Sequence, residues 1–383
     1  MRLSMNTRYA VIHASFWGAY GSLWAFIALV LEYNGFASAQ VGVVTSCATL
    51  LSVFLSPAVS SFLDARPGLE NRHGAMALLS LAAALCLLAW LVPLPRPFVL
   101  GAFLSSTPPF QNAMAMDANR CGIPVVYGFC RGVGSVSYAA AVLLLGFVLE
   151  RHAPTLLLPV FAALTACGLI AMAGFRLPER PDEAADRPAE HRSIAAVLRS
   201  HPRFALTLLG CMFFFLTHTI SNTYMNALVG KAGGTASAVG TSLAISAVLE
   251  LPAMTLVSRL QKRFSPGFFL RFAAGAEVVK FLIFYLARSM PFIYLGQCMQ
   301  FFQFAVYAPA TVYYVAAALP ERDQLKGQSL IYVAGSGLGG ALGNLLGGRL
   351  LDRSGIQAAL LLGTVSAAAS LLTFCLSTRE DSR

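Results

Sequence analysis

Charge is scarce in this 383-residue chain: Asp, Glu, Lys and Arg together supply 11% of its residues, whereas 57% are hydrophobic. Soluble domains carry about 25% charged residues, so this composition excludes a water-exposed globular protein. Acidic residues are the fewest, 17 against 27 Lys and Arg, which gives a formal net charge of +10. No basic cluster with interleaved aromatic residues accompanies this charge, so we expect no nucleic-acid partner.

The signatures of several enzyme and metalloprotein classes are also missing. The eight cysteines form no C-x-x-C pair or regular framework, which predicts small, inert core residues rather than disulfides. The six histidines show no metal-ligand spacing, and no nucleophile motif is present. A glycine-rich stretch at 335–347 is not followed by Gly-Lys-Ser/Thr, which excludes a phosphate-binding loop. We therefore expect no metal, no cofactor and no enzymatic activity.

Long hydrophobic runs are the dominant feature that remains. A transmembrane helix needs about 20 apolar residues, and the sequence supplies twelve such runs. The first run is not followed by a small-residue cleavage site, so it predicts a transmembrane helix rather than a signal peptide. The expected fold class is an all-α membrane protein with twelve spans near 9–31, 41–63, 75–95, 98–119, 124–149, 155–175, 204–229, 235–258, 267–288, 291–319, 327–351 and 356–377.

The polar segment 176–203 interrupts this series once. It is charged and contains prolines, which is typical of a linker, and it separates two six-helix bundles at 1–175 and 204–383. Nineteen Lys and Arg fall on the side that holds the linker and both termini, and six fall on the opposite side. The positive-inside rule therefore places the linker and both termini in the cytoplasm. The basic excess there suits an anionic membrane surface.

Internal repeats indicate how the two bundles are organised. The segment NGFASAQVG at 34–42 recurs as AGGTASAVG at 232–240, with a constant offset of 198 residues. A finer repeat relates GFVLER at 146–151 to GRLLDR at 348–353, each at the end of a predicted helix. Three-helix units that are inverted within each half and parallel between the halves are typical of secondary transporters.

Over nearly its whole length, the chain resembles the transporters of the major facilitator superfamily. Two stretches resemble the loop motif of that superfamily: Gly348-x-x-x-Asp352-Arg353-x-Gly355 and, less closely, Ser60-x-x-x-Asp64-Ala-Arg66-x-Gly68. The resemblance implies that Asp64, Arg66, Asp352 and Arg353 take part in the conformational change of transport. It also implies two pseudo-symmetric six-helix bundles that rock around a cavity at the membrane midplane.

Within the superfamily, the chain is most similar to the group of lactose permease and phenylpropionate-type permeases. The similarity rests on YGFCRGVGS at 127–135, Glu250-Leu-Pro252, Lys280 and GQSL at 327–330. It implies a proton symporter in which Arg131 contacts the substrate and an acidic residue assists it. Lactose permease also uses a histidine and an acid in its tenth helix, and the tenth predicted helix of this chain has neither.

Buried charges are the first candidates for a transport site. Arg131 and Lys280 are the only basic residues deep inside apolar segments, where a cation is costly unless it faces the bundle interior. Asp117 lies at a similar depth to Arg131, which predicts an ion pair that serves either the substrate or the structure alone. Glu277 shares a helix face with Lys280. Glu250 is the first choice for the proton carrier, and a plain salt bridge to Lys280 is the alternative.

Aromatic, amide and imidazole side chains supply the second set of candidates. The seventh predicted helix carries a polar stripe, and the 198-residue offset pairs it with an aromatic stripe in the first. Glutamines spaced by three continue the pattern in the tenth. Such groups suit a ring-bearing polar ligand, and the alternative is helix packing through interhelical hydrogen bonds. The predicted substrate-binding residues are Tyr20, Trp24, Arg131, His218, Asn222, Gln300 and Gln303.

A row of glycines marks the eleventh predicted helix. Gly335, Gly339, Gly343 and Gly347 are spaced by four residues and therefore lie on one ridge. Small residues on a ridge permit close helix packing, and they would also allow helices to slide during transport.

Together these features predict a secondary transporter of a bacterial inner membrane that imports a small polar solute by alternating access, driven by protons. A saccharide or nucleoside is favoured over an aromatic carboxylate, because at least three acids offset the buried cations. The alternatives are a proton-driven exporter of drugs or metabolites and a non-transporting receptor or scaffold. Such exporters usually carry Gly-Pro late in the fifth helix, which AVLLLGFVLE at 141–150 lacks. We expect a monomer whose partners are substrate, protons and membrane lipid.

Overall fold

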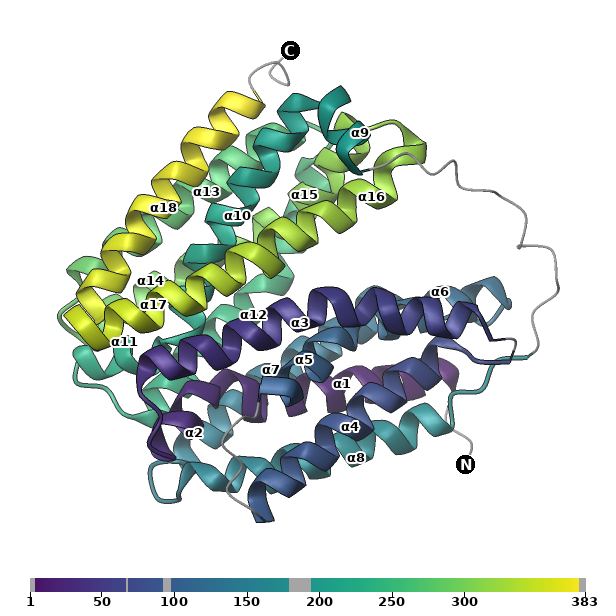
Figure 1. Ribbon diagram of the computed structural model, residues 1–383, viewed down its shortest axis with the longest axis horizontal. Helices are drawn as coiled ribbons and strands as arrows, with labels where there is room; N and C mark the ends of the chain where they lie inside the picture. The colour runs from purple at the N-terminus through teal and green to yellow at the C-terminus, as the bar shows by residue number, and fades with distance from the viewer. Residues whose placement is uncertain (1–3, 67, 92–97, 179–193, 379–383) are drawn as a thin grey trace. The chain divides into compact units, whose positions relative to one another are not determined.

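The computed structural model describes residues 4–66, 68–91, 98–178 and 194–378. Within these ranges every regular element is a helix (Figure 1). Ten helical segments in this part of the chain are long and apolar enough to span a membrane. Two more complete the twelve predicted spans: α13 (Pro266–Leu286), which carries three charged residues, and α5 (Phe98–Ser106) with α6 (Pro108–Arg120), which Thr107 separates. The predicted all-α membrane fold is thus confirmed.

The other elements follow the predicted series of spans, and α9 lies within the predicted linker. Before the linker they are α1 (Met5–Leu23), η1 (Trp24–Phe26), α2 (Ile27–Tyr33), α3 (Ser38–Asp64), α4 (Asn71–Leu91), α7 (Tyr127–Val148), η2 (Pro154–Leu156) and α8 (Leu157–Ala173). After it they are α9 (Ile194–Ser200), α10 (Pro202–Thr223), α11 (Met225–Lys231), α12 (Ala236–Leu260), α14 (Met290–Cys298), η3 (Met299–Phe301), α15 (Phe304–Ala318), α16 (Glu321–Tyr332), η4 (Val333–Gly339), α17 (Gly340–Ser354) and α18 (Ile356–Ser377).

The first helix of each predicted three-helix unit is interrupted, although the sequence predicts four continuous spans. α1 passes through the 3-10 turn η1 into α2, α10 ends at Tyr224, and η3 separates α14 from α15. Thr107 separates α5 from α6 because Pro108 and Pro109 follow it, and proline lacks the N–H that a continuing helix needs. Helix breaks at membrane depth are tolerated where they are buried in protein or line a cavity, which is where transporters bind their substrates.

The turns after α2 and α11 have the same geometry. Gly35 and Gly233, which the repeat aligns, both adopt left-handed φ angles of 84° and 77°. The N–H of Phe36 bonds the carbonyl of Leu31 at 3.1 Å, and that of Gly234 bonds the carbonyl of Val229 at 3.0 Å. Glycine tolerates this conformation because it has no Cβ. The aligned stretches therefore share a backbone conformation as well as residue types.

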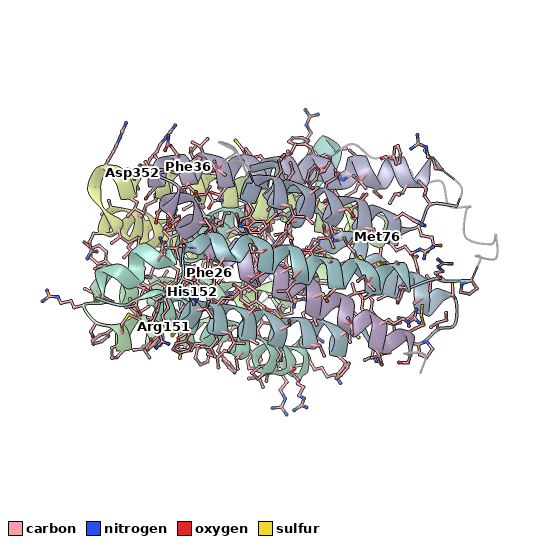
Figure 2. The ribbon with its side chains drawn as sticks, turned by 90° about the horizontal axis from the view of Figure 1, so that it is seen from below. Phe26, Phe36, Met76, Arg151, His152 and Asp352 are labelled. Atoms are coloured by element: carbon pink, nitrogen blue, oxygen red, sulfur yellow. The ribbon has the colours of Figure 1, made fainter. Side chains whose placement is uncertain are left out.

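Two compact units can be distinguished by their internal contacts. Unit 1 comprises Met1–Phe36, Val43–Asp182 and Ala236–Ala247, and unit 2 comprises Ala37–Gly42, Glu183–Thr235 and Val248–Arg383. In unit 1, α1 packs against α7 and α8, and α4 packs against α8; in unit 2, α10 packs against α17 and α18, and α13 packs against α15 and α18. Figure 2 shows Phe26 and His152 toward one end of unit 1 and Met76 toward the other. The first residues of α3 belong to unit 2, and the first residues of α12 belong to unit 1. The two units therefore differ slightly from the two bundles that the linker was predicted to separate.

Glycines near the starts of α3 and α12 meet backbone carbonyl groups of another helix at corresponding positions. In unit 2, Gly42 of α3 lies directly against the carbonyl group of Asn344 in α17. In unit 1, Gly240 of α12 lies against the carbonyl group of Val142 in α7. The repeat aligns Gly42 with Gly240, and Asn344 follows Val142 by the offset of the finer repeat. Both contacts depend on a missing Cβ.

An acidic residue accompanies each of these contacts. The carboxylate of Asp352, at the end of α17, accepts hydrogen bonds from the backbone N–H groups of Ser38 at 3.0 Å and Ala39 at 2.7 Å. The carboxylate of Glu150, which follows α7, accepts a hydrogen bond from the hydroxyl of Ser237 in α12. N–H groups at the start of a helix lack intrahelical partners and favour negative charge. Asp352 therefore acts as an N-terminal cap for α3, supplied by another helix.

We expect Asp352→Asn to lower the thermal stability of the purified protein. The amide keeps one acceptor atom but loses the charge, so the cost should be about 0.5–1 kcal/mol for this solvent-exposed cap. Thermal unfolding in detergent measures the effect. Arg353→Gln is the control, because Arg353 is exposed beside it. Equal melting temperatures for the Asp352→Asn variant and the wild type would contradict a capping role.

Candidate substrate-binding site

In unit 1, a cation and an aromatic stripe meet between α7 and α1. The guanidinium group of Arg131 lies 4.1 Å from the centroid of the Trp17 ring and donates a hydrogen bond to Ser135 at 2.8 Å. Trp17 in turn lies 5.5 Å from the Tyr20 ring, centroid to centroid. Trp17 approaches α7 closely because Gly134 offers no side chain there. An aromatic ring face stabilises a nearby cation by electrostatic attraction, and the cation keeps its positive charge.

Trp24 and Asp117 have surroundings that the sequence does not indicate. The Trp24 ring packs directly on Gly101 of α5, so part of it belongs to the helix packing of unit 1. Asp117 is buried and accepts a hydrogen bond from the Asn71 side chain at 2.7 Å. Asn71 begins α4 and was not among the predicted residues. The predicted ion pair between Asp117 and Arg131 stays a prediction.

His13 is a further residue of unit 1 that the sequence reasoning missed. Its side chain is 1% exposed and its ring lies 4.7 Å from that of Tyr9 and 6.0 Å from that of Tyr127. Among the described residues, neither of its ring nitrogens has a hydrogen-bond partner. A usable signal was present, because His13 precedes Trp17 by four residues and therefore shares its helix face.

In unit 2, the predicted polar residues His218 and Asn222 of α10 contact each other. The His218 ring stacks on Phe304 of α15 at 4.4 Å with an interplanar angle of 12°. The amide nitrogen of Asn222 lies 3.1 Å from Nε2 of His218 and also donates to the His218 carbonyl at 2.8 Å. Nδ1 of His218 is buried without a partner in the described part of the chain. His218 therefore keeps one nitrogen available to a ligand.

The predicted charges of α12 and α13 are joined by an amide. Nζ of Lys280 donates to Oε1 of Gln300 at 3.0 Å, and Nε2 of Gln300 donates to Oε1 of Glu250 at 3.0 Å. Oε1 of Glu277 accepts a hydrogen bond from the Thr217 hydroxyl at 2.7 Å. Gln300 therefore links Glu250 to Lys280 through hydrogen bonds, and the choice between a proton carrier and a salt bridge at Glu250 stays a prediction. α12 continues through Pro252, so the proline does not end the helix beside Glu250.

The three glutamines lie on either side of a helix break and within it. Gln297 belongs to α14, Gln300 to the 3-10 turn η3, and Gln303 is the N-cap residue of α15. Gln303 is fully buried, yet neither atom of its side-chain amide has a partner among the described residues. A buried amide without partners is costly, so this position suits a polar ligand.

The glycine ridge lies against α10, partly in a π-helical turn. Gly335 and Gly339 belong to the π-helix η4, and Gly343 and Gly347 belong to α17. Added Cβ atoms would meet Phe215 at Gly335, the Met212 carbonyl at Gly339, the Leu216 carbonyl at Gly343 and Tyr224 at Gly347. Single π-helical turns inside α-helices occur frequently at functional sites.

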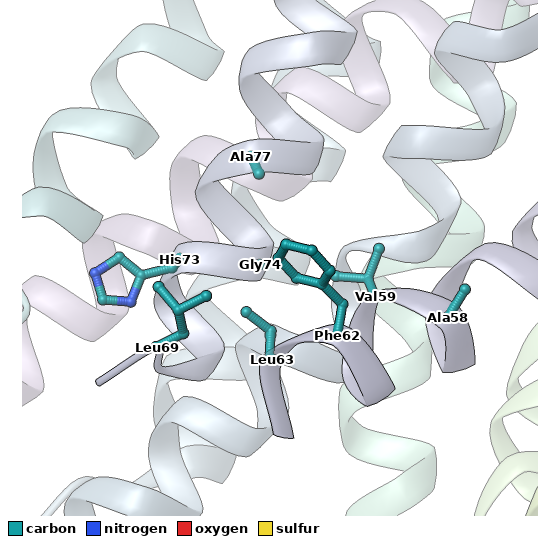
Figure 3. Close-up of a pocket in the computed structure, with 8 residues that line it drawn as sticks. All are labelled: Ala58, Val59, Phe62, Leu63, Leu69, His73, Gly74 and Ala77. Carbon is teal, nitrogen blue, oxygen red and sulfur yellow. The ribbon is translucent and has the colours of Figure 1, made fainter. Parts of the chain in front are cut away.

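The remaining predicted motif residues lie at helix ends. The side chain of Asp64 is outside the described part of the structure. The guanidinium group of Arg66 lies 3.6 Å from the centroid of the Phe62 ring. Figure 3 shows a groove of about 450 Å³ in the same region, formed by the end of α3 and the start of α4 and lined by Val59, Phe62, Leu69 and His73 among others. It is almost wholly apolar and contains none of the predicted substrate-binding residues, so it is not the substrate site.

Twelve helical spans in the described part of the chain, with buried charges and the unpartnered amide of Gln303 beside a helix break, are the features of a multi-pass membrane transporter. The chain belongs to the MFS_1 like family, whose model matches residues 6–362, so it is a transporter of the major facilitator superfamily and not an enzyme. The predicted superfamily is therefore confirmed.

Individual relatives show the same architecture. A maltose permease of Geobacillus stearothermophilus is 26% identical over 370 residues, which cover 95% of this chain and 92% of the relative. The solved nucleoside transporter NupG has a TM-score of 0.81 at 15% identity, and the match covers 100% of both chains. The solved fucose:proton symporter FucP of E. coli has a TM-score of 0.59 at 16% identity, covering 98% of this chain and 99% of that one. At these identities the solved structures show the fold alone.

Proposed function

We propose that this transporter is a proton-coupled symporter that imports a small neutral solute, a saccharide or a nucleoside, across a bacterial inner membrane. The observation that carries the proposal is the Lys280–Gln300–Glu250 network, which is at least partly buried throughout. Charged groups inside a membrane protein are costly and mark ion or substrate pathways. The related maltose permease and the fold shared with a nucleoside transporter and a fucose:proton symporter support the same classes of solute and ion.

The polar groups favour a neutral ligand over an anion. The cations Arg131 and Lys280 are accompanied by three acids, Asp117, Glu250 and Glu277. Gln303 and His218 add groups that donate or accept hydrogen bonds without net charge. Hydroxyl groups of a saccharide or ribose match such a set, because each hydroxyl is both donor and acceptor.

The positive-inside pattern supports cytoplasmic termini, and we propose that the chain works as a monomer.

Uptake into proteoliposomes tests the proposal. An inward proton gradient should drive accumulation of labelled maltose or uridine, and a dye in the lumen should report proton entry with the solute. We expect Arg131→Gln to reduce uptake about tenfold to a hundredfold, because a charge-assisted hydrogen bond is worth about 1.5–3 kcal/mol. Lys262→Gln, at an exposed position outside the predicted motifs, is the control.

Two results would contradict the proposal. The first is a gradient that drives neither solute although the folded protein is present. The second is full uptake by Arg131→Gln, which would remove this residue from the substrate site. Solute movement out of vesicles when the lumen is more alkaline than the medium would instead identify an exporter.

A further inference from the structure

The cluster around Lys280 has one more acid than it has cations. Glu250 and Glu277 both lie near Lys280, so full ionisation would leave a net charge of −1 inside unit 2. One bound proton makes the cluster neutral. Because an uncompensated buried charge is strongly unfavourable, the neutral form should dominate when the cluster is closed to water. The question is which of the two carboxyl groups carries this proton.

The geometry distinguishes the two acids. Glu277 is fully buried, and its Oε2 has no hydrogen-bond partner within the described residues. Its one hydrogen bond comes from the neutral Thr217 hydroxyl. Glu250 is partly exposed and accepts a hydrogen bond from the Gln300 amide. Lys280 directs its ammonium group to Gln300 rather than to Glu277, although it shares a helix face with Glu277.

An ionised carboxylate at Glu277 would therefore be poorly compensated, and one at Glu250 would be better solvated. A carboxylate normally accepts several hydrogen bonds, whereas a protonated carboxyl group carries no charge that needs them. We propose that Glu277, and not Glu250, holds the coupling proton, and that Gln300 is a positioning residue that links its state to Glu250. This inference rests on the proposed proton symport.

Gln300 can transmit the state of Glu277 because its amide has a defined direction. Its carbonyl oxygen accepts from Lys280, and its NH₂ group donates to Glu250, so the two ends are not interchangeable. When the O–H bond of Glu277 breaks, the proton passes to water on the release side and the electron pair stays on the carboxylate. Lys280 is then drawn toward Glu277 and away from Gln300. Gln300 is freed, and Glu250 loses its fixed donor at the same time.

Among the described residues, the groups that interact electrostatically with Lys280 are Glu277 and Glu250 of the cluster and His218 of α10. α14 and η3 contribute the amides of Gln297 and Gln300, and α18 contributes Gly363, which lies against Phe281. Cys211 of α10 and Tyr307 of α15 belong to the neighbouring hydrophobic core. None of these side chains is a second cation at neutral pH, so none of them replaces Lys280 as a counter-charge.

A substrate-independent measurement locates the proton. Infrared spectra of the full chain in lipid show a carbonyl-stretch band for each protonated buried carboxylic acid. We expect Glu277→Gln to remove a band that Glu250→Gln leaves in place at neutral pH. Glu277→Asp should shift the same band, which gives the answer if Glu277→Gln does not fold. A band that persists unchanged in both Glu277 variants, or that disappears in Glu250→Gln, overturns the assignment whether or not transport is proton-coupled.

Transport assays with maltose and uridine then test the role of the proton. Exchange of labelled for unlabelled solute across the membrane needs no net proton release. We therefore expect Glu277→Gln to keep exchange within about threefold of the wild type and to lose gradient-driven accumulation. Gln300→Leu should shift the pH profile of exchange, and Gln297→Leu, at a neighbouring glutamine, should not. Normal accumulation by Glu277→Gln contradicts the inference, whereas absence of proton-linked uptake in the wild type contradicts the proposed function alone.

Discussion

The Lys280→Met variant should lose active transport completely and unfold at a clearly lower temperature than the wild type. Lys280 is 1% exposed and is the cation of a cluster with two acids. Its removal leaves Gln300 without its donor and the ionised Glu250 carboxylate without a counter-charge. Removing one partner of a buried charge cluster typically costs about 3–5 kcal/mol. Accumulation in proteoliposomes and thermal unfolding in detergent give the two readouts.

Two further variants show whether lost charge balance explains the effects of Lys280→Met on transport and stability. Lys262→Met removes an exposed lysine at a helix end and should behave like the wild type. The double variant Lys280→Met with Glu250→Gln leaves only the protonated, neutral Glu277, so it restores neutrality and should regain much of the lost stability while remaining unable to accumulate solute. If Lys280→Met unfolds at the same temperature as the wild type, Lys280 does not compensate the charge of the neighbouring acids as described.

Gly240 is a position where a small change should have a large effect on packing. A Cβ there would overlap the carbonyl group of Val142 and approach the Cα of Gly146 at 3.1 Å. Because both partners are backbone atoms, they cannot move aside as a side chain can. We expect Gly240→Ala to destabilise unit 1 by about 1–3 kcal/mol, the usual cost of overpacking. Thermal unfolding of the purified protein measures it.

Gly275 provides the matched control on α13. An added Cβ at Gly275 has no atom within 4 Å, so Gly275→Ala adds no clash. Alanine is favoured over glycine inside a helix by about 1 kcal/mol, so this variant should be as stable as the wild type or slightly more stable. Shifts of the same sign and size in both variants would show that helix propensity, and not close packing, decides the effect at Gly240.

Features that depend on local sequence could be predicted well. The spans follow from the length of apolar runs, and the repeat anticipated that Gly35 and Gly233 occupy equivalent turns. The break at Thr107 also had a local signal in Pro108 and Pro109. The break at Tyr224 had no proline or glycine beside it to mark it.

The contacts of the site depended on residues far apart in the chain. The sequence indicated Glu250, Lys280 and Gln300 as candidates, but it did not indicate which of these side chains bond to one another. Gln300 is 20 residues from Lys280 and 50 from Glu250, and only the break at η3 turns its amide between them. Asn71 was missed because a single polar residue near a helix start has no periodic signal, whereas His13 had one in its spacing of four residues from Trp17.

The shared helices α3 and α12 restrict how this protein can evolve. The first residues of α3 belong to unit 2, and the first residues of α12 belong to unit 1. A recombinant chain that joins its own first half to the second half of a distant relative would therefore bring a foreign surface to both helix starts. Substitutions near Gly42 and Gly240 would need compensating changes on the other side of the linker. The two halves, although they share repeated stretches, are therefore constrained to diverge together.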